Sequence, residues 1–100
     1  MIKVLILFAT PLSEDEFYRY FSATHLPLLE AVPHVERLTV TRVAGAAIGE
    51  SPFGLVAELE FPSEEAMQQG LNSDAGQAMA RDYPAFASGG VTVLFCQGLT

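Results

Sequence analysis

The stretch Ser13–Pro33, SEDEFYRYFSATHLPLLEAVP, decides how the rest of the chain is interpreted. Its start has the signature of a helix N-terminus. Ser13 takes the N-cap position and Glu16 stands three residues later, which is the spacing of a capping box. Leu12 and Phe17 occupy the two positions of a hydrophobic staple, and acidic residues fill the first turn, where the helix dipole favours negative charge. The sequence therefore predicts that a helix begins at this serine.

An apolar stripe runs along the predicted helix. At about 100° per residue, four apolar side chains fall within roughly 60° of one another: Phe17, Phe21, Leu28 and Val32. His25 lies at the edge of this stripe. Pro27 follows two residues later, has no N–H for the carbonyl of the preceding turn, and crowds that turn with its ring. We therefore expect a kink or a break near Leu26, beside the imidazole.

Composition limits the class of protein. The chain has 100 residues, 50% of them hydrophobic and 17% charged, which excludes disorder and suits one domain, residues 1–100. Five basic and twelve acidic residues give a net charge of −7 without a basic cluster, which argues against nucleic acid or anionic lipid as a partner. No apolar run approaches the roughly 18 residues of a membrane span. The single cysteine, Cys96, cannot form an internal disulfide, so we expect a reducing, cytoplasmic location.

Four segments have the periodicity of β-strands: Ile2–Ala9, Val35–Val43, Phe53–Phe61 and Val91–Gln97. After the third strand, Ser63 caps a second helix, and residues 72–74 start another helical piece that Pro84 stops near Asp82. The order β-α-β-β-α-β predicts a ferredoxin-like α+β fold, in which both helices cover one face of a four-stranded antiparallel sheet.

The other face of the predicted sheet needs a partner. The first and last strands carry apolar side chains on both faces, and we expect them to form the central or near-central pair. The face without helices then exposes a larger apolar patch than a monomer usually carries. The sequence therefore predicts a C2 homodimer through the sheet face, with the two sheets closing into an α/β barrel.

The same residues resemble the EthD family of the dimeric α/β-barrel superfamily. The resemblance rests on the aromatic cluster Phe17–Phe21, the pattern His-x-Pro-Leu at residues 25–28, and Pro33 before the second strand. It implies a small dimer with a pocket between each sheet and its helices. Superfamily relatives include cofactor-free monooxygenases, polyketide cyclases and dehydratases, muconolactone isomerases and haem-handling proteins. The family histidine corresponds to His25, and the proline that follows it to Pro27.

His25 is the first candidate catalytic residue, as a general acid or base, because imidazole titrates near neutral pH. Its alternative role is structural, with a ring nitrogen bound to a backbone carbonyl that Pro27 leaves free. Tyr83 is the second catalytic candidate. Asp82 would hold the imidazole tautomer if it paired with the histidine, but we expect an ion pair at the helix end instead. Ligand contacts are assigned to four residues of the first helix: Phe17, Phe21, Pro27 and Leu28.

The remaining candidates receive ordinary structural roles. We expect Tyr20 to pack at a surface or interface, although a phenol near the histidine could orient a substrate carbonyl. Cys96 is expected to be a small core residue without a basic neighbour. His25 and His34 stand nine residues apart and are separated by two prolines, so no metal site is predicted. No glycine-rich phosphate loop follows a strand, so no cofactor is predicted either.

Two functions remain open. In the first, the chain is a cofactor-independent enzyme on a hydrophobic, aromatic or polyketide-like small molecule, and His25 moves a proton beside a carbonyl. In the second, it is a dimeric module that binds or carries such a molecule, and the histidine completes a hydrogen bond. The two differ in whether replacing this histidine removes turnover or weakens the fold.

Overall fold

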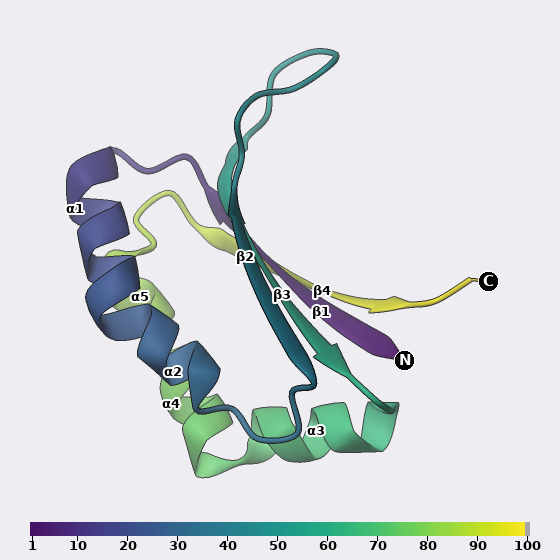
Figure 1. The fold of residues 1–100 in the computed structure, drawn as a ribbon. Coiled ribbons are helices and arrows are strands. Elements are labelled where there is room, and N and C mark those ends of the chain that lie inside the picture. Colours follow the sequence, from purple (N-terminus) through teal and green to yellow (C-terminus); the bar gives the residue numbers. More distant parts are fainter. Residues whose placement is uncertain (100) are drawn as a thin grey trace.

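The computed structural model describes residues 1–99, which form one four-stranded antiparallel sheet with every described helix on the same face (Figure 1). The strands are arranged in the order β2-β3-β1-β4. This confirms the predicted ferredoxin-like α+β fold. The strand bounds are β1 Ile2–Ala9, β2 Arg37–Arg42, β3 Phe53–Phe61 and β4 Val91–Gln97. The helix bounds are α1 Glu14–Tyr20, a π-helical turn Phe21–His25, α2 Leu26–Glu30, α3 Glu64–Asn72, α4 Asp74–Arg81 and α5 Tyr83–Phe86.

The first and last strands pair with each other, as expected, but the last strand does not lie at the centre of the sheet. β1 and β3 are the central strands, and β4 is an edge strand beside β1. β2 and β3 form a hairpin, so β3 lies between β2 and β1, and β4 takes the only place left on the other side of β1. Apolar residues on both faces of β4 therefore do not reflect a central position: Val93 and Phe95 remain 40% and 64% exposed.

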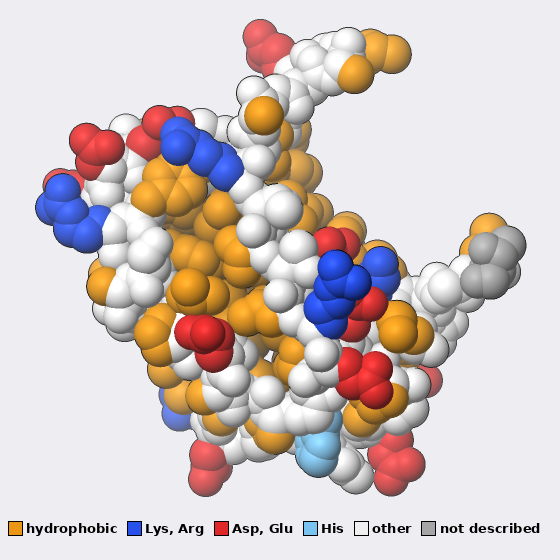
Figure 2. Space-filling model, in the orientation of Figure 1, with side chains coloured by type: hydrophobic (Ala, Val, Ile, Leu, Met, Phe, Trp, Pro, Cys, Tyr) orange, Lys and Arg blue, Asp and Glu red, His pale blue; other side chains and the backbone are white. Residues whose placement is uncertain are grey.

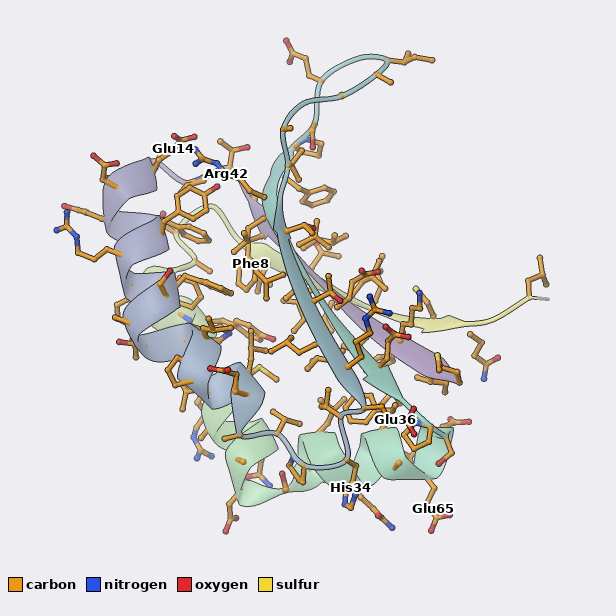
Figure 3. All side chains as sticks on the ribbon, viewed as in Figure 1. Phe8, Glu14, His34, Glu36, Arg42 and Glu65 are labelled. Atoms are coloured by element: carbon orange, nitrogen blue, oxygen red, sulfur yellow. The ribbon has the colours of Figure 1, made fainter. Side chains whose placement is uncertain are left out.

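The register of the central strands separates the two faces of the sheet. Val4, Ile6 and Phe8 of β1 stand opposite Leu59, Ala57 and Leu55 of β3, and all six are buried beneath the helices. Figure 3 shows Phe8 pointing from the sheet toward the helix layer. The space-filling view shows hydrophobic side chains gathered between the α1–α2 helix and β2, where the sheet and helix layers meet (Figure 2).

The first helix begins at the predicted residue, but the predicted side-chain interactions at its N-terminus are not formed. Ser13 is the N-cap residue of α1, yet its side chain makes no capping hydrogen bond, and Leu12 is 92% exposed, so the predicted staple is not formed. The sequence predicted a kink or a break near Leu26, and the helical chain does not break there. A π-helical turn precedes Pro27 instead, in which the N–H of Leu26 donates to the carbonyl of Phe21 five residues earlier. The helical chain thus continues through the proline.

The second half of the chain follows its predicted caps. The Ser63 side chain accepts a hydrogen bond from the N–H of Ala66, and Ser73 caps α4 by accepting from Gly76. α4 ends at Arg81 with Asp82 as its C-cap, as expected, but Pro84 does not end the helical structure. It lies in the first turn of the short helix α5, where a proline loses no intrahelical hydrogen bond.

Candidate functional site

His25 is the one polar residue in the buried core of residues 1–99, with an exposed fraction of 0%. It ends the π-helical turn. A π turn takes more residues per turn than an α-helix, so the histidine rotates from the edge of the apolar stripe back toward the core. Aromatic rings surround the imidazole, at centroid distances of 4.7 Å to Phe86, 5.2 Å to Tyr83, 5.6 Å to Phe21 and 5.9 Å to Phe8.

Asp82 joins this histidine to a tyrosine. It stands between α4 and α5, and its carboxylate oxygen Oδ2 lies 2.9 Å from Nδ1 of His25. The hydroxyl of Tyr20 donates to the other oxygen, Oδ1, over 2.7 Å. The aspartate side chain is 14% exposed, so both bonds form at the boundary of the core. Three side chains from two distant parts of the chain therefore form one hydrogen-bonded network.

The network sets the tautomer of the imidazole. Because a carboxylate only accepts hydrogen bonds, the proton of neutral His25 is on Nδ1, and the lone pair is on Nε2. Nε2 is buried and has no hydrogen-bond partner among residues 1–99. A buried polar atom of this kind is a weak point in a core but is suited to receive a proton or bind a ligand hydrogen.

Burial also sets the charge of the site. Desolvation is the main effect on His25 and lowers its pKa, against the opposing hydrogen bond and charge of Asp82. The imidazole is therefore neutral at pH 7. The hydrogen bond to the aspartate is the main cause that raises the pKa of Tyr20, and burial raises the pKa of Tyr83 to about 12. Both phenols stay protonated near neutral pH.

Two open clefts border the helix layer, and neither is lined by His25. The Tyr20 cleft has a volume of about 430 Å³ and is lined by ten residues: Pro11, Leu12, Ser13, Glu16, Phe17, Tyr20, Pro84, Ala85, Phe86 and Ser88. The hairpin cleft, of about 650 Å³, lies under the β2–β3 connection. Arg42 lines it, paired with Glu14 at 3.1 Å and placed 4.5 Å over the ring of Tyr18. Figure 3 shows this arginine beside the glutamate.

The EthD domain profile matches residues 9–90. The chain belongs to the EthD family. An EthD family protein of Bacillus halodurans has the same fold, with 30% identity, a TM-score of 0.91 and coverage of 99% of both chains. An uncharacterized 11.0 kDa protein from the thcB-thcC intergenic region of Rhodococcus erythropolis is 34% identical over 95% of this chain and 92% of its own length. SnoaB, a cofactor-independent oxygenase of Streptomyces nogalater, shares the fold at 15% identity, with a TM-score of 0.68 and coverage of 99% and 93%.

The EthD fold brings some of the predicted site residues together and separates others. Tyr83 packs against the imidazole, but its hydroxyl donates to Sδ of Met79 over 3.1 Å. Phe21 also contacts the imidazole, whereas Phe17 lines the Tyr20 cleft. Pro27 is exposed and Leu28 half-buried, and neither lines the two clefts described above.

Sequence reasoning preferred other roles for two members of the network. Asp82 was expected in an ion pair at the end of a helix, with a pairing to the histidine as the alternative, and the structure has the alternative, across 57 positions of the chain. Tyr20 was expected to pack at a surface, and it is the second partner of the same carboxylate. No sequence pattern within either segment indicates these contacts. Only the packing of α1 against the α4–α5 junction creates them.

Four other features concern the rest of this EthD chain. His34 is exposed on the loop before β2, at the opposite end of the molecule from Arg42 (Figure 3). Cys96 is half-buried in the edge strand β4 and pairs in register with Lys3, which corrects the expectation of a core position without a basic neighbour. In residues 1–99, no group of three or more potential metal ligands gathers at one place. No helix in that range has the length and apolar content to cross a membrane.

Proposed function

We propose that this EthD protein is a cofactor-independent enzyme that transfers a proton on a hydrophobic small molecule, with His25 as the general base. The observation that carries the proposal is the oriented imidazole: Asp82 fixes Nδ1 as the donor, and Nε2 holds an unpartnered lone pair in an apolar enclosure. A lowered pKa keeps the base unprotonated at neutral pH. SnoaB, which has the same fold, is named as an oxygenase that needs no cofactor.

The reaction follows from the chemistry of that lone pair. Nε2 of His25 takes a proton from the carbon next to a substrate carbonyl, and the electrons of the broken C–H bond move to the carbonyl oxygen as an enolate. The imidazolium, stabilised by Asp82, then returns a proton to the same or another carbon. Tyr83 stays a candidate for contact with the substrate, because its ring packs on the imidazole.

The energetics favour a chemical role over a purely structural one. A buried polar atom without a hydrogen bond costs about 1–3 kcal/mol. If His25 had only a structural role, a residue without an unpaired buried nitrogen would make the core more stable. The imidazole therefore has a cost in stability that a proton-transfer role explains.

A second candidate function is a binding or carrier module. The observation that favours it is the complete burial of His25, which leaves no open path from either cleft to the imidazole in this conformation. In this case the histidine and Asp82 stabilise the wall of a binding site, and the bound molecule leaves unchanged.

Deuterium exchange separates the two candidates. 2-Tetralone and related hydrophobic ketones are incubated in D₂O with wild-type protein or with His25→Asn, and deuterium at the carbon next to the carbonyl is followed by NMR. The enzyme proposal predicts exchange that falls about 10²–10⁴-fold in the variant. Ketones that bind, seen as shifts of the protein resonances, without exchange above the variant's rate would support the carrier module instead.

We also propose that two copies pair through the face of the sheet that the helices leave bare. Leu5, Leu7, Val56 and Leu94 form an apolar strip across β3, β1 and β4 on that face. Light scattering at micromolar concentration should give a dimer, and Leu7→Glu should give a monomer. Leu12→Glu is the matched control, because this leucine is 92% exposed and lies off the sheet. A monomeric wild-type protein would contradict the proposal.

A further inference from the structure

We propose that the Tyr20 cleft binds an uncharged aromatic compound and that the ring of Phe86 is the partition between this compound and His25. The inference rests on the proposed function for what the histidine does once it is reached. It adds where the ligand binds, which chemical class it belongs to, and which residue determines its access.

Phe86 is the one side chain lining the cleft whose ring packs against the imidazole. Its centroid lies 4.7 Å from that of His25, which is the shortest ring distance in the cluster around the histidine. It also lies 5.3 Å from the ring of Phe17 and is stacked 5.1 Å from that of Tyr20, both of which line the cleft. The same ring therefore belongs to the cleft wall and to the enclosure of the histidine.

Tyr20 gives the cleft a second link to the network. Its ring lines the cleft, and its hydroxyl donates to Asp82, whose other oxygen contacts Nδ1 of His25. A ligand that contacts Phe86 is thus separated from the imidazole by that ring alone, and a ligand that contacts this tyrosine is linked to the imidazole through the Asp82 carboxylate. Phe86 also lies on the four-residue helix α5, which has no side-chain cap and precedes Gly89 and Gly90. A rotation of one side chain on this short element would open the path.

The lining defines the class of ligand. A volume of about 430 Å³ lies in the range of small-molecule sites, and most of the wall is proline, leucine, alanine and phenylalanine. Stacking on Phe86 and Tyr20 suits a flat aromatic ring. Glu16 is the only charged side chain in the lining, and the Asp82 carboxylate stands behind Tyr20, so both carboxylates repel an anion in the cleft.

Chemical modification measures access to the imidazole without a substrate. Diethyl pyrocarbonate acylates neutral imidazoles, and the exposed His34 provides an internal reference within the same molecule. Mass spectrometry gives the ratio of the rates at His25 and His34. Phe86→Ala should raise this ratio by about tenfold, because the ring that packs on the imidazole is gone. Phe86→Leu provides the same test if the alanine variant fails to fold.

Phe17→Ala is the matched control. Phe17 lines the same cleft and is more deeply buried, but its ring is not paired with that of His25. Its loss should destabilise the protein at least as much while leaving the modification ratio at the wild-type value. An unchanged ratio in both Phe86 variants, or an equal rise in Phe17→Ala, would overturn the inference.

A pair of probes tests the ligand class. 2-Naphthol, neutral at pH 7, should shift the NMR resonances of Phe86 and Tyr20 and slow the modification of His25. 2-Naphthoate has the same rings with a negative charge, and it should bind about tenfold more weakly or worse. Equal binding of the two probes, or binding that leaves the cleft resonances unmoved, would refute the assignment. Neither readout depends on turnover, so these results stand apart from the deuterium-exchange test of the proposed function.

Discussion

Replacing Asp82 tests the network most directly. Asp82→Ala removes the acceptor for Nδ1 of His25, which is 0% exposed and cannot turn to water, and it leaves that N–H unpaired in the core. The half-buried hydroxyl of Tyr20 can reach solvent instead. Losing a hydrogen bond to a charged group and stranding a buried donor should cost about 2–3 kcal/mol. Because 1 kcal/mol corresponds to about 4–8 °C in a chain of this size, the melting temperature should fall by about 10–20 °C.

Asp82→Asn tests whether the shape of the Asp82 side chain or its negative charge stabilises the network. The asparagine carbonyl can still accept from Nδ1 of His25, and its N–H₂ can donate to the oxygen of Tyr20, so about 1 kcal/mol or less should be lost. Circular-dichroism melts at pH 7.5 measure both variants, with Asp15→Ala as a control for an exposed acidic residue that faces only the dipole of α1. If the alanine variant of Asp82 costs less than about 1 kcal/mol, or no more than Asp15→Ala, the network does not stabilise the site as argued.

Three further measurements follow from the structure. The lowered pKa of His25 means that, in acid, the unfolded chain takes up a proton that the folded chain does not. The free energy of unfolding should therefore fall as the pH drops below about 6.5, by at most about 1.4 kcal/mol per pH unit. His25→Asn should remove this dependence. Burial raises the pKa of Tyr83 to about 12, so the free energy of unfolding should fall as the pH rises from 10 toward 12. In a pH titration followed by phenolate absorbance, Tyr83→Phe should lack the ionisation step at the highest pH. A Cβ on Gly76 would collide with the carbonyl oxygens of Gly70 and Leu71, so Gly76→Ala should cost about 1–3 kcal/mol in a urea titration, whereas Gly45→Ala, with open space around it, should cost almost nothing.

The strands were predictable because their signal is local. Phe53–Phe61 alternates without interruption, and β3 has those bounds; Val91–Gln97 likewise matches β4. In both segments the alternation of faces is a property of the chain itself. The caps at Ser63 and Ser73 were predictable for the same reason, since each serine bonds to a backbone N–H three residues later.

The strand order and the network depend on contacts that no local pattern contains. Apolar residues on both faces of β4 suggested a central strand, but an edge strand that offers one face to a partner carries the same pattern. The π turn at Phe21–His25 shows the same limit, because a proline predicts a disturbance without saying whether the helix breaks or widens. The sequence allowed a pairing of Asp82 with the histidine, but only the packing of Tyr20 and His25 against the α4–α5 junction selects it over an ion pair at the helix end.

Stability alone does not account for the pair formed by His25 and Asp82. Apolar residues of similar volume, packed against Phe8 and Phe86, would leave no buried nitrogen bare and would remove the cost of desolvating a carboxylate. The pair also couples the two helical crossovers, because its members come from opposite halves of the chain and neither can be placed until both halves are packed. By this reasoning, we expect a core that includes this coupling and an unpartnered lone pair to be less stable than its apolar alternative. What the lone pair can do, which is to take a proton in an enclosure of aromatic rings, is therefore the better explanation for its presence.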